Sequence, residues 1–139
     1  MKNTHILTVM LALLLCPVLR AQEQPLTPEQ REKKMRENID AAVLRYEKDL
    51  RLEDWQSFYV DSILTHNIGE RNKELEVLSS NKVENMDLYT MIADKWEEAT
   101  YNAFRAILSD EQWNRYLKSG AGRNKKARDK RAEKRSVEK

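Results

Sequence analysis

The sequence predicts an all-α protein, and three observations support this prediction. Proline does not occur after Pro28, and Gly69 is the only glycine between Pro28 and Ser119, so few residues in this stretch oppose a helix. Apolar residues recur at intervals of three and four, which places them on one face of a helix. Two short phrases with helix-capping chemistry mark helix starts near the two ends of this stretch.

The first capping phrase is Leu26-Thr-Pro-Glu-Gln30. Thr27 is a preferred N-cap residue, and Gln30, three residues later, can reach back to the amide of the cap. Pro28 occupies the first helical position, where its missing N–H costs nothing. We expect a helix from Pro28 to about Asp49. Its apolar stripe consists of Met35, Ile39, Ala42, Val43, Tyr46 and Leu50.

Two longer helices are expected in the middle of the chain. The second starts near Glu53, within Leu52-Glu-Asp-Trp-Gln56, a looser copy of the first phrase. Its expected apolar stripe contains Trp55, Tyr59, Ile63, His66, Leu75 and Leu78. The polar segment 79–85 is the clearest break. The third helix is expected from about Asp87 to Leu108, with the stripe Leu88, Met91, Ile92, Trp96, Ala99, Ala103, Phe104 and Ile107.

The second capping phrase, Leu108-Ser-Asp-Glu-Gln112, starts a short fourth helix with Ser109 as its N-cap. This helix is expected to bury Trp113, Tyr116 and Leu117. Gly120 is expected to end it as a C-cap. Four amphipathic helices, one of them short, predict a thin hairpin or cradle rather than a thick globule. Such a layer either leaves apolar surface open or covers it with a second copy, so we expect a homodimer.

Charge separates the body of the chain from its C-terminal tail. Residues 22–118 contain 14 Lys and Arg against 20 Asp and Glu, a net charge of −6. Residues 119–139 contain 9 against 3, a net charge of +6. The tail has only small apolar residues between Arg123 and Arg135, so we expect a solvated helix or a disordered segment. Folding back onto the acidic body is the alternative.

The first 21 residues predict a signal peptide. Lys2 is followed by an apolar run from Ile6 to Leu15, which is shorter than the roughly 20 residues that a spanning helix needs. Cleavage is expected after Ala21, leaving the helical domain 22–118 and the tail. A lipoprotein acylated at Cys16 is disfavoured because Leu15, and not a small residue, precedes it. Cleavage removes the only cysteine, which excludes disulfides and thiolate chemistry.

The two capping phrases resemble the Leu-Thr-x-x-Gln motif of the Spy/CpxP family of small periplasmic helical proteins. The matching residues are Leu26, Thr27, Gln30, Leu108, Ser109 and Gln112, with Ser109 in place of threonine. The resemblance implies a periplasmic location, a cradle-shaped antiparallel dimer of long helices, and a structural role for the motif. Spy-like members are ATP-independent chaperones, called holdases, that bind unfolding proteins. CpxP-like members bind the periplasmic domain of an envelope-stress sensor kinase.

The sequence accordingly predicts a holdase for unfolded or partly folded envelope proteins, with a partner of an envelope sensor as the alternative. A holdase without ATP needs exposed apolar groups among charges, so that clients bind quickly but weakly. Phe58 and Tyr101 lie off the best apolar stripes and are the candidate client contacts. The opposing interpretation is that these rings belong to the core.

The basic tail suggests a further alternative, binding to an anionic surface such as a membrane. The candidate contacts are Lys125, Lys126, Arg128, Lys130, Arg131, Lys134 and Arg135. Nucleic acid is not an expected partner, because the tail lacks aromatic residues that could stack on bases.

Catalysis and a bound cofactor are not expected. The chain has no glycine-rich phosphate loop and no Glu-x-x-His pair of the kind that di-iron bundles use. A third branch of the family that the chain resembles binds metal, but the chain after residue 21 contains only one histidine, His66. His66 and Glu70 could form half a metal site that a dimer completes. A packed or solvated histidine is the preferred interpretation, so no metal is predicted.

Overall fold

The computed structural model describes residues 25–137, and over this range the fold is all-α. The elements are α2 (Pro28–Leu50), α3 (Asp54–Ser80), α4 (Met86–Ile107), α5 (Asp110–Tyr116), the π-helical turn η2 (Leu117–Ala121) and α6 (Gly122–Val137). None of the helices in this range is both long and apolar enough to cross a membrane. The predicted signal peptide and Cys16 lie outside the described residues.

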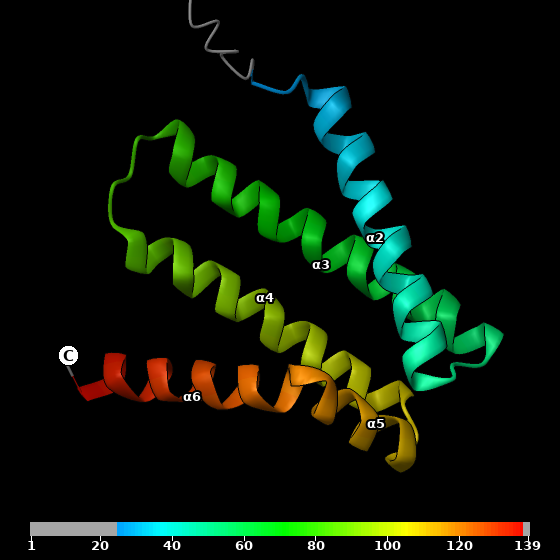
Figure 1. The fold of residues 1–139 in the computed structure, drawn as a ribbon. Helices are drawn as coiled ribbons and strands as arrows, with labels where there is room; N and C mark the ends of the chain where they lie inside the picture. Colours follow the sequence, from blue (N-terminus) through cyan, green and yellow to red (C-terminus); the bar gives the residue numbers. More distant parts are fainter. Residues whose placement is uncertain (1–24, 138–139) are drawn as a thin grey trace, which may run out of the picture.

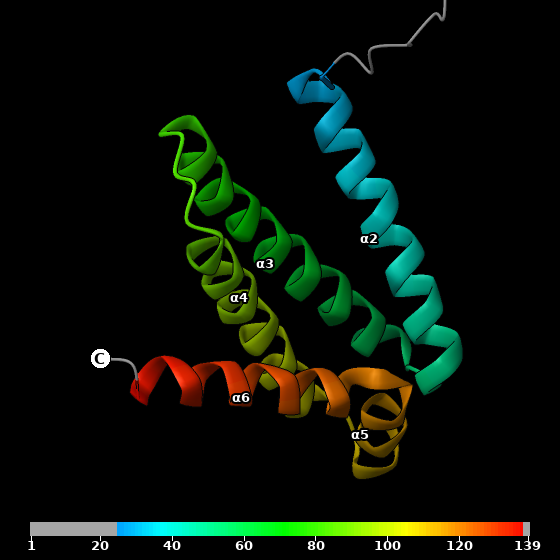
Figure 2. The same ribbon diagram turned by 60° about the vertical axis from the view of Figure 1, so that its left-hand side comes forward.

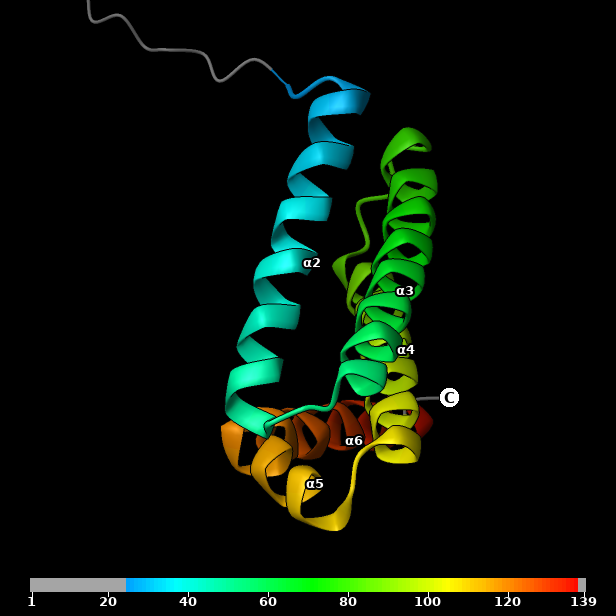
Figure 3. The same cartoon turned by 90° about the vertical axis from the view of Figure 1, so that its right-hand side faces the viewer.

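Helices α3 and α4 form an antiparallel hairpin, and the other helices are arranged around it (Figure 1). α2 meets α3 near the turn that joins them and then separates from it toward its own N-terminus (Figures 2 and 3). α2 and α3 thus form an open V, whose closed end is the turn between them. α5 lies across this closed end, and α6 runs back from α5 (Figure 1). The thin, open arrangement is the one that the amphipathic pattern predicts.

The helix starts agree with the predicted caps. The backbone N–H of Gln30 donates to Thr27 Oγ1 at 3.2 Å, and the N–H of Thr27 donates to Gln30 Oε1 at 2.9 Å. The same reciprocal pair joins Ser109 and Gln112 at the start of α5. The looser phrase also forms a capping box at the start of α3, with Glu53 as the N-cap. All three phrases therefore begin helices.

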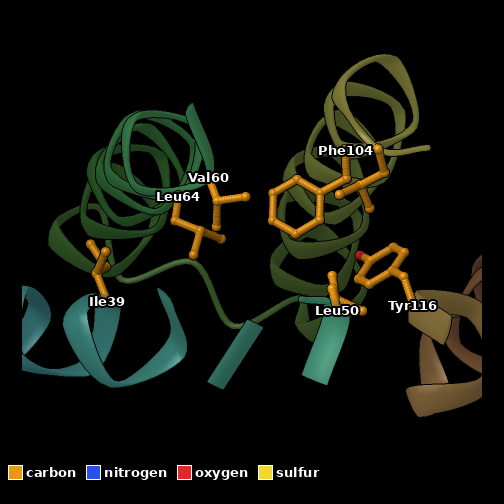
Figure 4. Close-up of a cluster of buried hydrophobic side chains, with 7 residues drawn as sticks. Ile39, Leu50, Val60, Leu64, Phe104 and Tyr116 are labelled. Atoms are coloured by element: carbon orange, nitrogen blue, oxygen red, sulfur yellow. The ribbon is translucent and has the colours of Figure 1, made fainter. Parts of the chain in front are cut away.

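The buried core lies at the closed end of the V. It consists of Ile39, Leu50, Val60, Leu64, Phe104, Leu108 and Tyr116. Figure 4 shows Val60 and Leu64 of α3 facing Phe104 of α4, with Leu50 and Tyr116 beside them. The ring of Tyr46 meets the edge of Phe104, with 5.3 Å between the ring centroids. The far ends of α2, α3 and α4 contribute none of these buried residues, so they extend from the core as arms.

Helix α3 is rotated relative to the predicted stripe. Trp55 and Tyr59 were expected to be buried, but both are exposed. The buried side of α3 instead carries Gln56, Val60, Leu64 and Asn67. Two of these four residues are polar, so the hydrophobic pattern does not reveal this face. Gln56 is hydrogen-bonded inside the structure, and with this face buried Trp55 and Tyr59 lie on the exposed side of α3.

The chain does not stop at the predicted C-cap. Gly120 has a φ of 114°, a conformation that side-chain-bearing residues rarely adopt, so glycine is required there. The π-helical turn around Gly120 redirects the backbone, which then continues as α6. The basic tail is therefore helical from Gly122 to Val137, and its docking on α4 bears on the candidate site.

Candidate functional site

Two glutamines from different capping phrases bind each other at the closed end of the V. Gln56 Nε2 donates to Gln112 Oε1 at 2.7 Å, and Gln112 Nε2 donates to Gln56 Oε1 at 2.8 Å. We call these two residues the glutamine pair. Gln56 is only 3 % exposed, so water does not satisfy its amide. The pair is a buried polar contact between the start of α3 and the start of α5.

The remaining hydrogen bonds of the glutamine pair go to the backbone. Gln56 Nε2 also donates to the carbonyl of Ile107 at 2.9 Å, and Gln112 Nε2 donates to the carbonyl of Arg51 at 3.1 Å. Each side-chain oxygen also accepts the N–H of its own N-cap residue. Each amide thus makes four hydrogen bonds, its full capacity. The pair ties the α2–α3 turn to the α4–α5 turn and holds α3 in its rotation.

The two capping phrases that carry the family resemblance are 26–30 and 108–112, yet the structure joins phrase 108–112 to the looser phrase 52–56. Gln30 caps only its own helix, and Leu26 is exposed, whereas Leu108 is buried. The partner of Gln112 comes from the looser phrase, through Gln56. Sequence reasoning did not single out Gln56 as a site residue, although its spacing of four from Leu52 was the available signal.

An exposed group of three rings lies at the start of α3, and we call it the aromatic cluster. Its members are Trp55, Phe58 and Tyr59, which are 49 %, 68 % and 51 % exposed. The ring centroids of Trp55 and Tyr59 are 6.1 Å apart, and those of Phe58 and Tyr59 are 5.8 Å apart. Trp55 Nε1 donates to Glu53 Oε2 at 2.7 Å, which orients the indole. Phe58, a candidate client contact, therefore belongs to an ordered, solvent-facing apolar patch.

Tyr101, the other candidate client contact, is not freely exposed. It packs against the core, and its ring centroid lies 4.7 Å from that of Trp113. The guanidinium of Arg128 lies 5.6 Å from the centroid of the Tyr101 ring, and Lys125 Nζ lies 5.8 Å from it. The expectation of an exposed Tyr101 is therefore wrong, because α6 folds over this part of α4.

The basic residues of α6 divide into an inward set and an outward set. Arg128 is 6 % exposed and pairs with Glu97 at 3.3 Å and Glu98 at 3.1 Å. Arg131 makes a two-pronged contact with Asp94, through Nε at 2.9 Å and Nη2 at 2.5 Å. The other inward residues and their acids on α4 are Arg135 with Asp94 and Asp87, and Lys125 with Glu98. Lys126, Lys130 and Lys134 are exposed on the outer side.

The ion pairs change the titration of Asp94, whose side chain is 13 % exposed. Hydrogen bonds from Arg131, followed by those from Arg135, hold the pKa of this carboxyl below its ordinary value, against the opposing effect of burial. Asp94 therefore remains charged in the folded protein at neutral pH. Four of the seven candidate anionic-surface contacts face these acids, so the predicted basic surface is smaller than the sequence suggests.

The residues considered for a metal do not converge. The His66 side chain is exposed, and its ring centroid lies 5.9 Å from that of Trp96 in an edge-to-face contact. Glu70 pairs with Lys73, and hydrogen bonding to that lysine is the main reason that its pKa is lowered. Within residues 25–137, no three His, Cys, Asp or Glu side chains come close enough to hold a metal ion.

The space between the helices contains an open cavity of about 470 Å³, which we call the central cavity. Residues from α2, α3, α4, α5, η2 and α6 line it, and among them are Arg45 and Arg71. The aromatic cluster takes no part in its lining. The molecule thus offers two separate surfaces for binding, one exposed and aromatic and the other recessed and mixed in polarity.

Comparison with known proteins gave no match, whether against family models, curated proteins or solved structures. Proposals for what this chain does therefore depend on its own residues.

Proposed function

We propose that this chain is an exported, ATP-independent holdase that binds unfolded or partly folded proteins and prevents their aggregation. The observation that carries the proposal is the solvent exposure of the aromatic cluster on α3, Trp55, Phe58 and Tyr59. Neighbouring exposed aromatic side chains of this kind mark binding surfaces, since burying them in an interface removes apolar area from water.

Preorganisation of the cluster supports this role. The rings contact one another, the indole is hydrogen-bonded to Glu53, and the glutamine pair anchors the same end of α3. Little conformational entropy of these side chains is therefore lost when a client binds this surface. The contact area of three rings is small, so an extended apolar segment is held weakly and can dissociate without an energy source.

Two methionines at the start of α4 provide a second apolar region. Met86 and Met91 are exposed there, beside the end of α3 that lies opposite the aromatic cluster. Methionine side chains are flexible and adapt to varied partners. Helix α3 is 27 residues long, which corresponds to about 40 Å. An unfolded segment could contact both regions by lying along the hairpin.

The proposed location and family depend on the sequence. The apolar segment that precedes residue 22 supports export to the periplasm, and the capping phrases support a relationship to the Spy/CpxP family. The glutamine pair is consistent with a structural role for that motif. A homodimer remains part of the proposal, because the open V leaves apolar side chains on its arms.

The test is light scattering from a reduced, unfolding protein, with and without the purified chain and in the absence of ATP. We expect suppression of aggregation near a stoichiometric ratio. Phe58→Ser should require about fivefold more protein, since a loss of roughly 1 kcal/mol of client binding corresponds to that ratio.

Leu44→Ser is the matched control, because Leu44 is an aliphatic residue on α2 that is similarly exposed at 65 % but belongs to no ring cluster. This variant should suppress aggregation as well as the unmodified chain does. Failure of the unmodified chain to suppress aggregation at several-fold excess would contradict the holdase proposal. A dedicated partner, such as a sensor domain, would then be sought by pull-down from envelope extract.

A further inference from the structure

We propose that the central cavity binds a small amphiphile with an anionic headgroup, either carboxylate or phosphate, on an apolar chain. The cavity lies between α2, α3 and α4 and is bordered by η2 and the start of α6. Its volume of about 470 Å³ falls within the usual range of small-molecule sites. The proposal is independent of the holdase surface, because the aromatic cluster lies outside the cavity.

The apolar part of the site continues the core. Leu50, Leu64 and Tyr116 line the cavity and are also members of the buried core, where Figure 4 shows them together. Tyr46 and Trp96 add aromatic surface from α2 and α4. A site bounded by packed core residues keeps its shape, so an apolar chain can enter it without reorganising the protein.

Three arginines line the cavity, and because Arg128 is paired with Glu97 and Glu98, Arg45 and Arg71 supply its remaining positive charge. Arg45 and Arg71 line it from α2 and α3, and neither forms an ion pair with another residue of the range 25–137. Arg71 Nε is buried and has no hydrogen-bond acceptor, while Arg71 Nη2 reaches only Asn72 Oδ1, at 3.4 Å. A buried donor of this kind is unfavourable until an acceptor reaches it. A guanidinium matches the geometry of a carboxylate or phosphate group.

The acids around the cavity do not reverse this preference. Glu97 lines it, but Glu97 Oε2 accepts a hydrogen bond from Arg128 at 3.3 Å. Asp49 is the other acidic residue of the lining, and its single negative charge is outnumbered by the two positive charges of Arg45 and Arg71. A cationic headgroup would meet two arginines and a single uncommitted carboxylate, whereas an anionic headgroup would meet an excess of positive charge. The charge distribution therefore selects an anion.

Isothermal titration calorimetry of the purified chain with decanoate, below its micelle concentration, tests the proposal. We expect saturable binding of one decanoate per chain. Neutral decanamide and cationic decylammonium have the same apolar chain and should bind at least tenfold more weakly. A parallel titration with decyl phosphate identifies which anionic headgroup is preferred. Equal binding of decanoate and decanamide would overturn the proposal.

Variants locate the binding site. Arg71→Gln should weaken decanoate binding about tenfold and leave decanamide binding unchanged. Arg45→Gln should also weaken decanoate binding, and this variant provides the test if Arg71→Gln does not fold. Arg31→Gln is the matched control, because Arg31 lies on α2 outside the cavity and pairs with Glu76. Unchanged decanoate affinity in both the Arg71 and Arg45 variants would contradict the proposal.

Phe58→Ser separates this proposal from the holdase. It should retain full decanoate binding, because Phe58 is not part of the cavity lining. Loss of decanoate binding in this variant would place the ligand on the aromatic cluster and overturn the cavity site, whatever the aggregation assay shows.

Discussion

At the level of single residues, the glutamine pair shows why position 56 needs an amide, although a carboxylate there could also cap the helix. Glutamate at the third helical position accepts the N–H of the N-cap as well as glutamine does. Gln56 also donates two hydrogen bonds, to the carbonyl of Ile107 and to Gln112 Oε1. A carboxylate has no N–H to replace these donors.

Gln56→Glu should therefore lower the free energy of unfolding by about 2 kcal/mol, because it removes two donated hydrogen bonds and places a buried carboxylate against two acceptor oxygens. Urea unfolding at neutral pH measures this change. Gln30→Glu is the matched control: the Gln30 side chain only accepts, from the N–H of Thr27, and is exposed. Its effect should stay within about 0.5 kcal/mol. Equal losses in the two variants would contradict the role assigned to the pair.

At the level of elements, α6 docks through charge rather than through an apolar face. Its inward cations Arg128, Arg131 and Arg135 recur at intervals of three and four, and they meet Asp94 and neighbouring acids of α4. Isolated exposed ion pairs contribute little to stability. Here Arg128 is buried and covers the Tyr101 ring, so the contact also carries packing and cation–π attraction.

Asp94→Asn should lower the free energy of unfolding by about 1–3 kcal/mol at pH 7, because it removes a partly buried partner of two arginines. The pKa of Asp94 is lowered from an ordinary value of 3.8 in the folded state, so its stabilisation is complete above about pH 5. That stabilisation disappears as the pH falls through the depressed folded pKa. The difference between the two proteins, measured by urea unfolding from pH 7 to pH 2.5, should shrink accordingly.

The matched control for Asp94 is Glu37→Gln, which removes an exposed pair with Lys33 on α2. This variant should change stability by less than about 0.5 kcal/mol at any pH in the series. An Asp94→Asn difference that stays constant down to pH 2.5 would show that charge on Asp94 does not hold α6.

At the level of the whole molecule, the open V concentrates stability at one end and exposes binding surface elsewhere. The core, the glutamine pair and the contacts of α5 all lie at the closed end. The aromatic cluster lies on the part of α3 nearest this end, whereas Met86 and Met91 lie at the far end of the hairpin. Arms with few buried contacts open more easily than a core does. This division suits a protein that must adapt to varied clients.

Removal of residues 122–139 tests whether α6 belongs to this architecture. The truncated chain should lose about 2 kcal/mol of unfolding free energy, because Tyr101 becomes exposed and the acids of α4 lose their partners. Urea unfolding followed by tryptophan fluorescence measures the loss. The double substitution Lys126→Ala and Lys130→Ala alters only exposed side chains and should be near neutral. A truncated chain as stable as the full one would make α6 a solvated appendage.

Local features were predictable because they depend on residues within about one helical turn. Thr27 and Ser109 begin their helices as expected, since an N-cap bonds to an amide three residues away. Phe58 was expected to be exposed from its place off the apolar stripe, and it is exposed. The buried face of α3 was missed, because Gln56 and Asn67 are polar and hydrophobic periodicity cannot detect them.

The sequence by itself determined the all-α class, the helix starts and the separation of an acidic body from a basic tail, because composition and short-range hydrogen bonding decide these features. Tertiary structure alone decided that Gln56 pairs with Gln112, that α6 covers Tyr101, and that Arg45 and Arg71 face one cavity. These contacts join residues tens of positions apart. Their formation depends on how the helices rotate and pack, and a periodic pattern along a single helix contains no information about its neighbours.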